Sequence, residues 1–123
     1  MKKLLMLICA LFMFGCTNNK QIFSGEYKLQ NSPEDAQITL MFENQEFSGS
    51  SGVNRYFGNF THTETNIKFN SIGMTMMMGP KELMDAEQTY LKSLEKADSY
   101  TYNNGILTLK NSTGSELIFK KIK

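Results

Sequence analysis

Four methionines crowd into five residues, Met74-Thr75-Met76-Met77-Met78, and they are the groups of this chain best suited to chemistry. Thioethers are soft ligands that select Cu(I), so converging methionines could hold one ion. The same sulfurs could be a surface target for oxidants. Alternation along a strand would instead turn Met74, Met76 and Met78 to one face, to fill the core or an interface. Only Met77 would then face outward. We favour packing and expect no metal, which leaves these methionines as weak metal candidates.

Groups for enzymatic catalysis are sparse. His62 is the single histidine, it stands between two threonines in an expected loop, and no acid is assigned to it. The acidic pairs Glu34-Asp35 and Glu43/Glu46 lie at expected turns, with no partner base or oriented nucleophile. The sequence lacks the nucleophile elbow, the phosphate-binding loop and the glycine-rich dinucleotide fingerprint. We therefore expect a protein that is not an enzyme and uses no cofactor.

The composition narrows the class of protein. The chain has 123 residues, which fits one domain, and 41% of them are hydrophobic, which excludes a disordered chain. Lysine and arginine number 13 against 12 acids, so the formal charge of +1 provides no field for binding nucleic acid. Two cysteines and one histidine exclude a Cys/His zinc finger and an iron–sulfur cluster.

The N-terminus has the pattern of a secretory signal peptide. A basic start, Met1-Lys2-Lys3, precedes an uninterrupted apolar run over residues 4–14. As a helix this run would rise about 16 Å, roughly half of the hydrocarbon core of a bilayer, so it is too short to span a membrane. We therefore predict that residues 1–15 are a signal peptide that is removed.

Cys16 is predicted to carry the lipid anchor of a bacterial lipoprotein. Met13-Phe14-Gly15-Cys16 resembles the lipobox, in which the cysteine after a small residue is lipidated and becomes the new N-terminus. The alternative is an ordinary free cysteine after a plain signal. Acyl chains would anchor the protein stably, and residues 16–21 would tether a domain over residues 22–123. An aspartate directly after the lipidated cysteine would favour retention in the inner membrane, and this chain has Thr17 there. We therefore expect the protein to be anchored in the outer membrane, facing the periplasm.

The elements that must position these residues are mostly strands. Asn103-Asn104-Gly105 predicts a type I′ hairpin turn, because asparagine and glycine suit positive φ angles. Glu43-Asn44-Gln45 indicates a second tight turn. Short strands at this spacing favour an antiparallel sheet or small barrel. The expected strands cover residues 26–29, 37–42, 53–60, 66–69, 100–102, 106–109 and 116–121.

One amphipathic helix is predicted over residues 80–97, laid on a curved sheet. Pro80 suits the first helical position, where its missing N–H costs nothing. Glu82, Asp85 and Glu87 lie in the first half and lysines in the last, which complements the helix dipole. The predicted fold class is therefore α+β: a curled antiparallel β-sheet, or cracked small barrel, with one helix. The apolar stripe of the helix comprises Leu83, Ala86, Tyr90, Leu91, Leu94 and Ala97.

The block Asn54-Arg55-Tyr56 is the second candidate site. In a strand, Asn54 and Tyr56 share one face with Gly58, while Arg55 lies on the other. Arginine and tyrosine are favoured at interface hot spots, so the block could bind a partner. In the structural interpretation, which we favour, Gly52 and Gly58 permit bulges or close backbone approach and Asn54 satisfies a turn.

The segment from Gly52 to Phe60, Gly-Val-Asn-Arg-Tyr-Phe-Gly-Asn-Phe, resembles the signature of the META domain, the HslJ-like family. A second family element, Thr-x-Met-Ala-Cys-Pro before a helix, is similar to residues 75–80. The match covers about residues 22–121. The family's cysteines fall on Val53 and Gly79 here; the resemblance implies that they pair in relatives, and that no redox role of such a pair applies to this chain.

The resemblance implies a small α+β domain of META or HslJ-like type in a bacterial envelope lipoprotein, linked to heat or antibiotic stress. It transfers no catalytic residue. We therefore expect a non-catalytic lipoprotein that binds a protein or envelope component, in a stress response, and no nucleic acid. Cu(I) binding by residues 74–78 is one alternative. The other is a carrier of a small apolar ligand, in a partly open barrel lined by Phe47, Phe57, Phe60, Phe69 and the methionines.

Overall fold

A computed structural model describes residues 22–123. The expected signal peptide (1–15), Cys16 and the tether (16–21) lie outside the described residues. No helix within the described part of the chain is long and apolar enough to cross a membrane. The elements are β1 (Gly25–Leu29), a 3-10 turn η1 (Glu34–Ala36), β2 (Thr39–Glu43), β3 (Glu46–Ser50), β4 (Arg55–His62), β5 (Ile67–Met74), α2 (Lys81–Lys96), β6 (Ser99–Asn103), β7 (Ile106–Lys110) and β8 (Glu116–Lys121).

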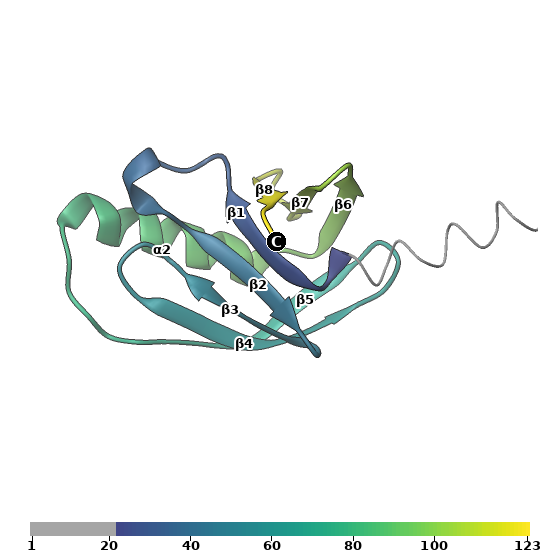
Figure 1. Ribbon diagram of the computed structural model, residues 1–123, viewed down its shortest axis with the longest axis horizontal. Coiled ribbons are helices and arrows are strands. Elements are labelled where there is room, and N and C mark those ends of the chain that lie inside the picture. The colour runs from purple at the N-terminus through teal and green to yellow at the C-terminus, as the bar shows by residue number, and fades with distance from the viewer. Residues whose placement is uncertain (1–21) are drawn as a thin grey trace, which may run out of the picture.

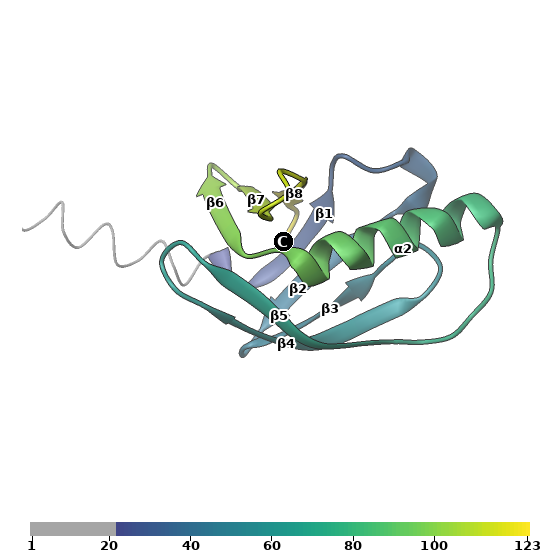
Figure 2. The ribbon, with the colours of Figure 1, turned by 180° about the vertical axis from the view of Figure 1, so that it is seen from behind.

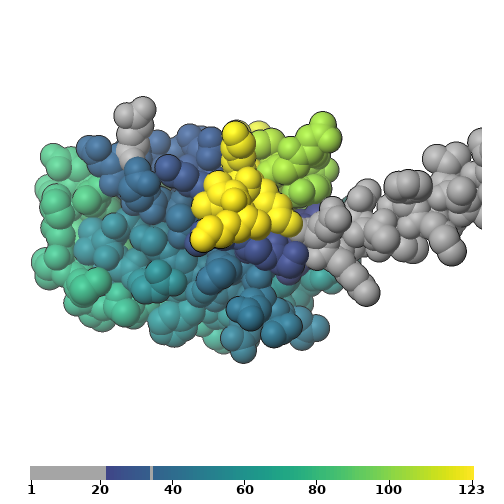
Figure 3. Space-filling view, in the orientation of Figure 1, coloured from purple at the N-terminus to yellow at the C-terminus, as the bar shows by residue number. Residues whose placement is uncertain are grey.

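The strands form one eight-stranded sheet in the order β5-β4-β3-β2-β1-β8-β7-β6, with every neighbouring pair antiparallel. The sheet curls around α2, so the helix lies in its trough (Figures 1 and 2). The C-terminal residues lie against the first strand, which places the two ends of the domain in the middle of the sheet (Figure 3). The predicted α+β fold, a curled antiparallel sheet with one helix, is confirmed.

The two edge strands, β5 and β6, nearly close the sheet into a barrel. They meet at a single bridge between Asn66 and Ser99, supported by hydrogen bonds from Ile67 N to Asp98 O and from Tyr100 N to Thr65 O. Beyond this point β5 diverges from β6 (Figure 2). The free edge of β5 and α2 line an open groove. The barrel is therefore closed at one end and open along β5.

The two predicted hairpin turns are confirmed. Asn44 and Gln45 connect β2 to β3 with φ angles of 50° and 66°, and Asn104 and Gly105 connect β6 to β7 with φ angles of 49° and 82°. Two central residues with positive φ give a turn whose twist matches that of the flanking strands. These turns fix the register of both hairpins from local sequence alone.

Several expected boundaries differ from the structure, three of them for reasons that the contacts show. The helix begins after Pro80, which precedes it as the N-cap instead of occupying its first position. The strand expected over residues 53–60 begins at Arg55, because Ser51 N donates to Asn54 O and closes a tight turn there. The strand expected over residues 66–69 continues to Met74, because β4 pairs along that whole length around a bulge near Asn59. Long-range pairing decides this last boundary.

The trough is filled by aromatic side chains. Phe42 and Phe60 contact at 4.9 Å between ring centroids, and Phe47 and Phe69 at 5.0 Å. From α2, Tyr90 and Leu94 complete this core. Three of the four phenylalanines expected to line a ligand cavity are thus packed core, and the fourth, Phe57, is 51% exposed on the outside of the sheet.

Candidate functional site

Asn54, in the turn before β4, joins three parts of the fold. Its Nδ2 donates to Glu87 Oε2 (2.9 Å) on α2 and to the carbonyl of Met77 (3.1 Å). Its Oδ1 accepts from the backbone N–H of Met77 (2.5 Å) and from Thr75 Oγ1 (2.9 Å). One buried amide therefore fixes the segment after β5 to both β4 and the helix.

Glu87 is a buried carboxylate that hydrogen bonds alone compensate. It is 1% exposed, and its Oε1 accepts from Ser51 Oγ (2.5 Å) and from Asn54 N (2.7 Å). Lys81 and Asp85 form an ion pair on the surface, and no cation among the side chains that the structure describes lies within ion-pair distance of Glu87. Burial raises the pKa of Glu87, but the hydrogen bonds from Ser51 and Asn54 outweigh it and hold the pKa below its usual value.

Tyr56 and Tyr90 form a second buried contact between β4 and α2. The Tyr56 hydroxyl donates to the carbonyl of Thr39 (2.6 Å) and hydrogen-bonds the Tyr90 hydroxyl. Burial and the neighbouring hydroxyl raise the pKa of Tyr56 well above its usual value, so the phenol stays neutral. A partner on the surface reaches neither Tyr56 nor Asn54, and in the described chain no buried side-chain nitrogen or oxygen lacks a hydrogen-bond partner.

The two glycines of the motif serve different purposes, a positive φ angle at Gly52 and a close approach at Gly58. Gly52 has a φ of 122°, a conformation that glycine adopts readily. A Cβ at Gly58 would lie 2.6 Å from the ring of Phe47 and 2.7 Å from the carbonyl oxygen of Asn70. Gly58 thus lets β4 pass the core aromatic and the bulged β5.

Arg55 and Phe57 alternate with the buried residues and face outward. Arg55 is exposed and, in the described part of the chain, no acid pairs with its guanidinium. The ring of Phe57 lies over Gly73, where a Cβ would come within 2.8 Å of it. Of the five motif residues singled out from the sequence, Arg55 is the one whose side chain a partner can reach freely.

Residues 75–80, here called the methionine strap, connect β5 to α2 around one end of the domain (Figures 1 and 2). Met76 and Met78 are each 87% exposed and Met77 is 55% exposed. Met76 and Met78 therefore do not fill the core, which was one of the two forms of packing expected for them; packing in an interface stays a prediction. The strand ends at Met74, which does pack partly against the core, and beyond it the Asn54 amide holds the chain through the backbone of Met77.

Val53 and Gly79 lie side by side. A Cβ at Gly79 would be 3.5 Å from the Cβ of Val53, within the range that a disulfide requires, and 2.8 Å from its Cγ2. These are the positions where the resemblance puts the family's cysteines. In this chain the Val53 side chain instead makes a van der Waals contact with Gly79. This contact attaches the strap at a second place, next to the Asn54 hydrogen bonds.

The remaining candidates carry no catalytic geometry. His62 ends β4 instead of lying in the expected loop. It is exposed, its ring lies tilted against that of Phe23 with 4.2 Å between the centroids, and its Nδ1 lies 3.2 Å from the carbonyl of Thr63. The described residues contain no group of three or more His, Cys, Asp or Glu side chains that could hold a metal. Among the described residues, the thioethers of the strap therefore remain the candidate ligands for a soft metal ion.

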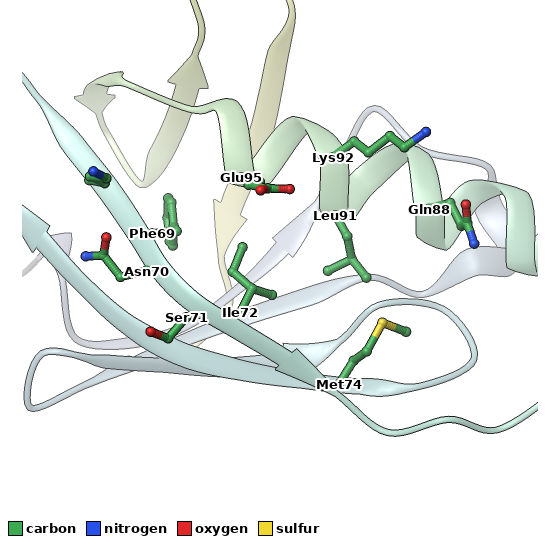
Figure 4. Close-up of a pocket in the computed structure, with 10 residues that line it drawn as sticks. Phe69, Asn70, Ser71, Ile72, Met74, Gln88, Leu91, Lys92 and Glu95 are labelled. Carbon is green, nitrogen blue, oxygen red and sulfur yellow. The ribbon is translucent and has the colours of Figure 1, made fainter.

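A groove of about 630 Å³ runs between the free edge of β5 and α2. Its floor is apolar, with Ile72 and Met74 from the strand facing Leu91 from the helix (Figure 4). Lys92 and Glu95 of the helix also line it (Figure 4). It is an open surface groove, and one aromatic residue of the core, Phe69, also lines it (Figure 4).

Sequence reasoning missed Glu87 and Ser51. The sequence places Glu87 only among the acids in the first half of the helix, where they complement the helix dipole. The spacing of Glu87 indicates its burial, because it follows Leu83 by four residues and precedes Tyr90 by three. This spacing places it on the apolar stripe of the helix. An acid on such a stripe must find donors within the fold, and here Ser51 and Asn54 supply them.

Comparison with known proteins agrees with this geometry. An NMR structure of a protein from Burkholderia xenovorans superposes with a TM-score of 0.71 at 22% identity, covering 84% of this chain and 86% of that one. A crystal structure of a DUF4847 family protein from Bacteroides vulgatus gives a TM-score of 0.61 at 16% identity, covering 85% and 97%. These likenesses show the fold, and a search of curated proteins gives no match. The META domain profile matches residues 20–123, so the chain belongs to the META domain family.

Proposed function

We propose that this META domain is the folded part of a non-catalytic envelope lipoprotein, and that it binds a protein partner through Arg55, Phe57 and the methionine strap. One observation carries the proposal. Of the five large hydrophobic side chains exposed in the described chain, four are Phe57, Met76, Met77 and Met78. Exposed aromatic, methionine and arginine side chains are the types enriched in protein interfaces.

The placement of these residues supports one surface. Arg55 lies two residues from Phe57 on the outer face of β4, and its backbone pairs with Thr75, immediately before Met76. The strap lies at the end of the domain opposite the point where the described chain begins (Figures 1 and 2). A lipid on Cys16 would therefore leave this surface directed away from the membrane to which the protein is anchored.

The partner is tested by crosslinking in cells, purification from detergent-solubilised membranes and mass spectrometry. Arg55→Ala should lose a stoichiometric protein partner while the melting temperature changes by less than about 2 °C, because its side chain is exposed. Phe57→Ser should lose the same partner and should also cost about 1 kcal/mol of stability, because the ring is half-buried over Gly73. Lys110→Ala, an exposed change on β7, is the matched control and should keep the partner. Retention of the same partner by both variants would overturn the proposed surface.

The anchor and the stress role need separate tests. The wild-type protein should carry acyl mass and fractionate with the outer membrane, and Cys16→Ser should abolish both. Processing that survives Cys16→Ser, with no acyl mass on the wild type, would contradict the anchor. Loss of the gene should sensitise cells to heat or to an antibiotic, with rescue by the wild type and not by Arg55→Ala.

The β5–α2 groove supports a second candidate function, carriage of a small apolar ligand. Its apolar floor and its volume of about 630 Å³ fit the size of small-molecule sites. Native mass spectrometry of the purified protein should then show a co-purifying apolar molecule that Leu91→Gln removes. A clean apo mass would contradict this function and leave the partner surface standing.

A further inference from the structure

The six methionines of the described chain divide into two groups by exposure. Met76 and Met78 are 87% exposed and Met77 is 55% exposed. Met41, Met74 and Met84 are each partly buried. An oxidant in solution must reach the sulfur to react with it, so the rate of thioether oxidation follows exposure. The fold thus separates three exposed thioethers from three that are less accessible.

The exposed methionines do not hold the strap in place. Asn54 binds the backbone N–H and C=O of Met77, and Thr75 N donates to the carbonyl of Arg55. At the other end of the strap, Val53 packs on the backbone of Gly79. Because every one of these attachments uses the backbone or another side chain, the sulfurs of Met76 and Met78 are free to change without loosening the fold.

We propose that the methionine strap is a reversible oxidation site for two-electron oxidants of the peroxide class, and that it reacts first at Met76 and Met78. The thioether sulfur donates an electron pair to one peroxide oxygen, an S–O bond forms and the O–O bond breaks. The other oxygen leaves as hydroxide and takes up the proton that the new S–OH group loses, so the products are the sulfoxide and water. The sulfur is oxidised by two electrons and the peroxide is reduced by two.

The product defines the reaction that must follow. A sulfoxide is polar and chiral, and methionine sulfoxide reductases return it to the thioether, one enzyme for each epimer. The strap would therefore alternate between an apolar and a polar state at the end of the domain, while Asn54 keeps its backbone in place. This inference does not depend on a protein partner.

The test is limited oxidation of the full chain, purified as its host cell produces it, with hydrogen peroxide. Peptide mass spectrometry should show sulfoxide at Met76 and Met78 forming about tenfold faster than at Met41, Met74 or Met84. In denaturant the rates at all these positions should converge to within about twofold, because exposure no longer differs. Equal rates in the folded protein would overturn the proposal.

Two controls separate a built site from incidental damage. Met76→Leu/Met78→Leu should lose the fast phase of peroxide consumption, whereas Met84→Leu should keep it. Protein oxidised in the fast phase should keep its melting temperature to within about 2 °C, and a mixture of the two sulfoxide reductases should restore the starting mass. A collapse of the melting temperature, or sulfoxides that the reductases cannot reach, would also overturn the proposal.

Discussion

Replacing Asn54 with alanine tests whether the motif asparagine is the clamp of the domain. The change removes four side-chain hydrogen bonds, one of them to the buried carboxylate of Glu87 and three to the strap residues Thr75 and Met77. The bond to a charged acceptor is worth about 2 kcal/mol. The strap groups lie near solvent and water replaces part of their bonding, so we assign them together about 1 kcal/mol.

The free energy of unfolding should therefore fall by about 3 kcal/mol, which in a domain of this size lowers the melting temperature by roughly 15 °C. Urea unfolding followed by circular dichroism at pH 7 measures the first quantity and a thermal scan the second. Asn59→Ala is the matched control, because Asn59 is an exposed asparagine on β4 and its loss should cost less than about 0.5 kcal/mol. Equal losses for the two variants would refute the assignment of Asn54 as a clamp.

Asn54→Asp refines the same test without changing the size of the side chain. At neutral pH it places a second carboxylate where the amide now lies 2.9 Å from Glu87, and like charges at this distance disfavour ionisation of both. The variant should be less stable than Asn54→Ala at pH 7 and should recover stability as the pH falls towards 5, when one carboxyl is protonated. A variant whose stability does not rise on mild acidification would contradict the proximity of the two groups.

Three further predictions follow from the same region. Since the pKa of Glu87 is lower in the folded state, ionised Glu87 stabilises the fold above the unfolded pKa of about 4.3, and this stabilisation is lost as the pH falls through the lower folded value. The unfolding free energy of the wild type should therefore fall between about pH 5 and 3, and Glu87→Gln should flatten that fall. Urea titration at each pH measures both. The double variant Val53→Cys/Gly79→Cys should form a disulfide under oxidising conditions. The oxidised form should have an unfolding free energy about 3 kcal/mol higher than the reduced form. Failure to oxidise would contradict the 3.5 Å separation of the two Cβ atoms. Gly58→Ala should cost about 2 kcal/mol in urea unfolding, because the new Cβ would lie 2.7 Å from the carbonyl of Asn70, and an unchanged midpoint would show that β5 moves freely there.

Local sequence was sufficient where the deciding contacts are local. Asn104-Gly105 forms its turn because both residues accept positive φ, and the register of β6 and β7 follows from it. The helix followed from the period of its apolar stripe, and its ends were predicted to within one residue of the observed Lys81–Lys96. The last strand, Glu116–Lys121, was predicted with its observed bounds for the same reason, since alternation over a few residues defines it.

Local patterns failed where partners are distant in the sequence. The methionine strap has the alternation of a strand, yet it is irregular, because Asn54, 23 residues before Met77, occupies its backbone groups. Glu87 has the charge of a surface residue, yet it is buried, because Asn54 and Ser51, 33 and 36 residues away, donate to it. Neither partner could be chosen from the sequence, since several asparagines and serines were available.

The sequence by itself determined the fold class, the hairpin turns, the helix and the META family resemblance, because these rest on period, turn chemistry and a contiguous motif. Only the tertiary structure decided which residues of that motif are buried and which are presented to solvent. Asn54 and Tyr56 became internal clamps while Arg55, Phe57 and the exposed methionines of the strap formed the accessible surface. The physical reason is that a strand fixes alternation, whereas the packing of α2 in the curled sheet determines which face is covered.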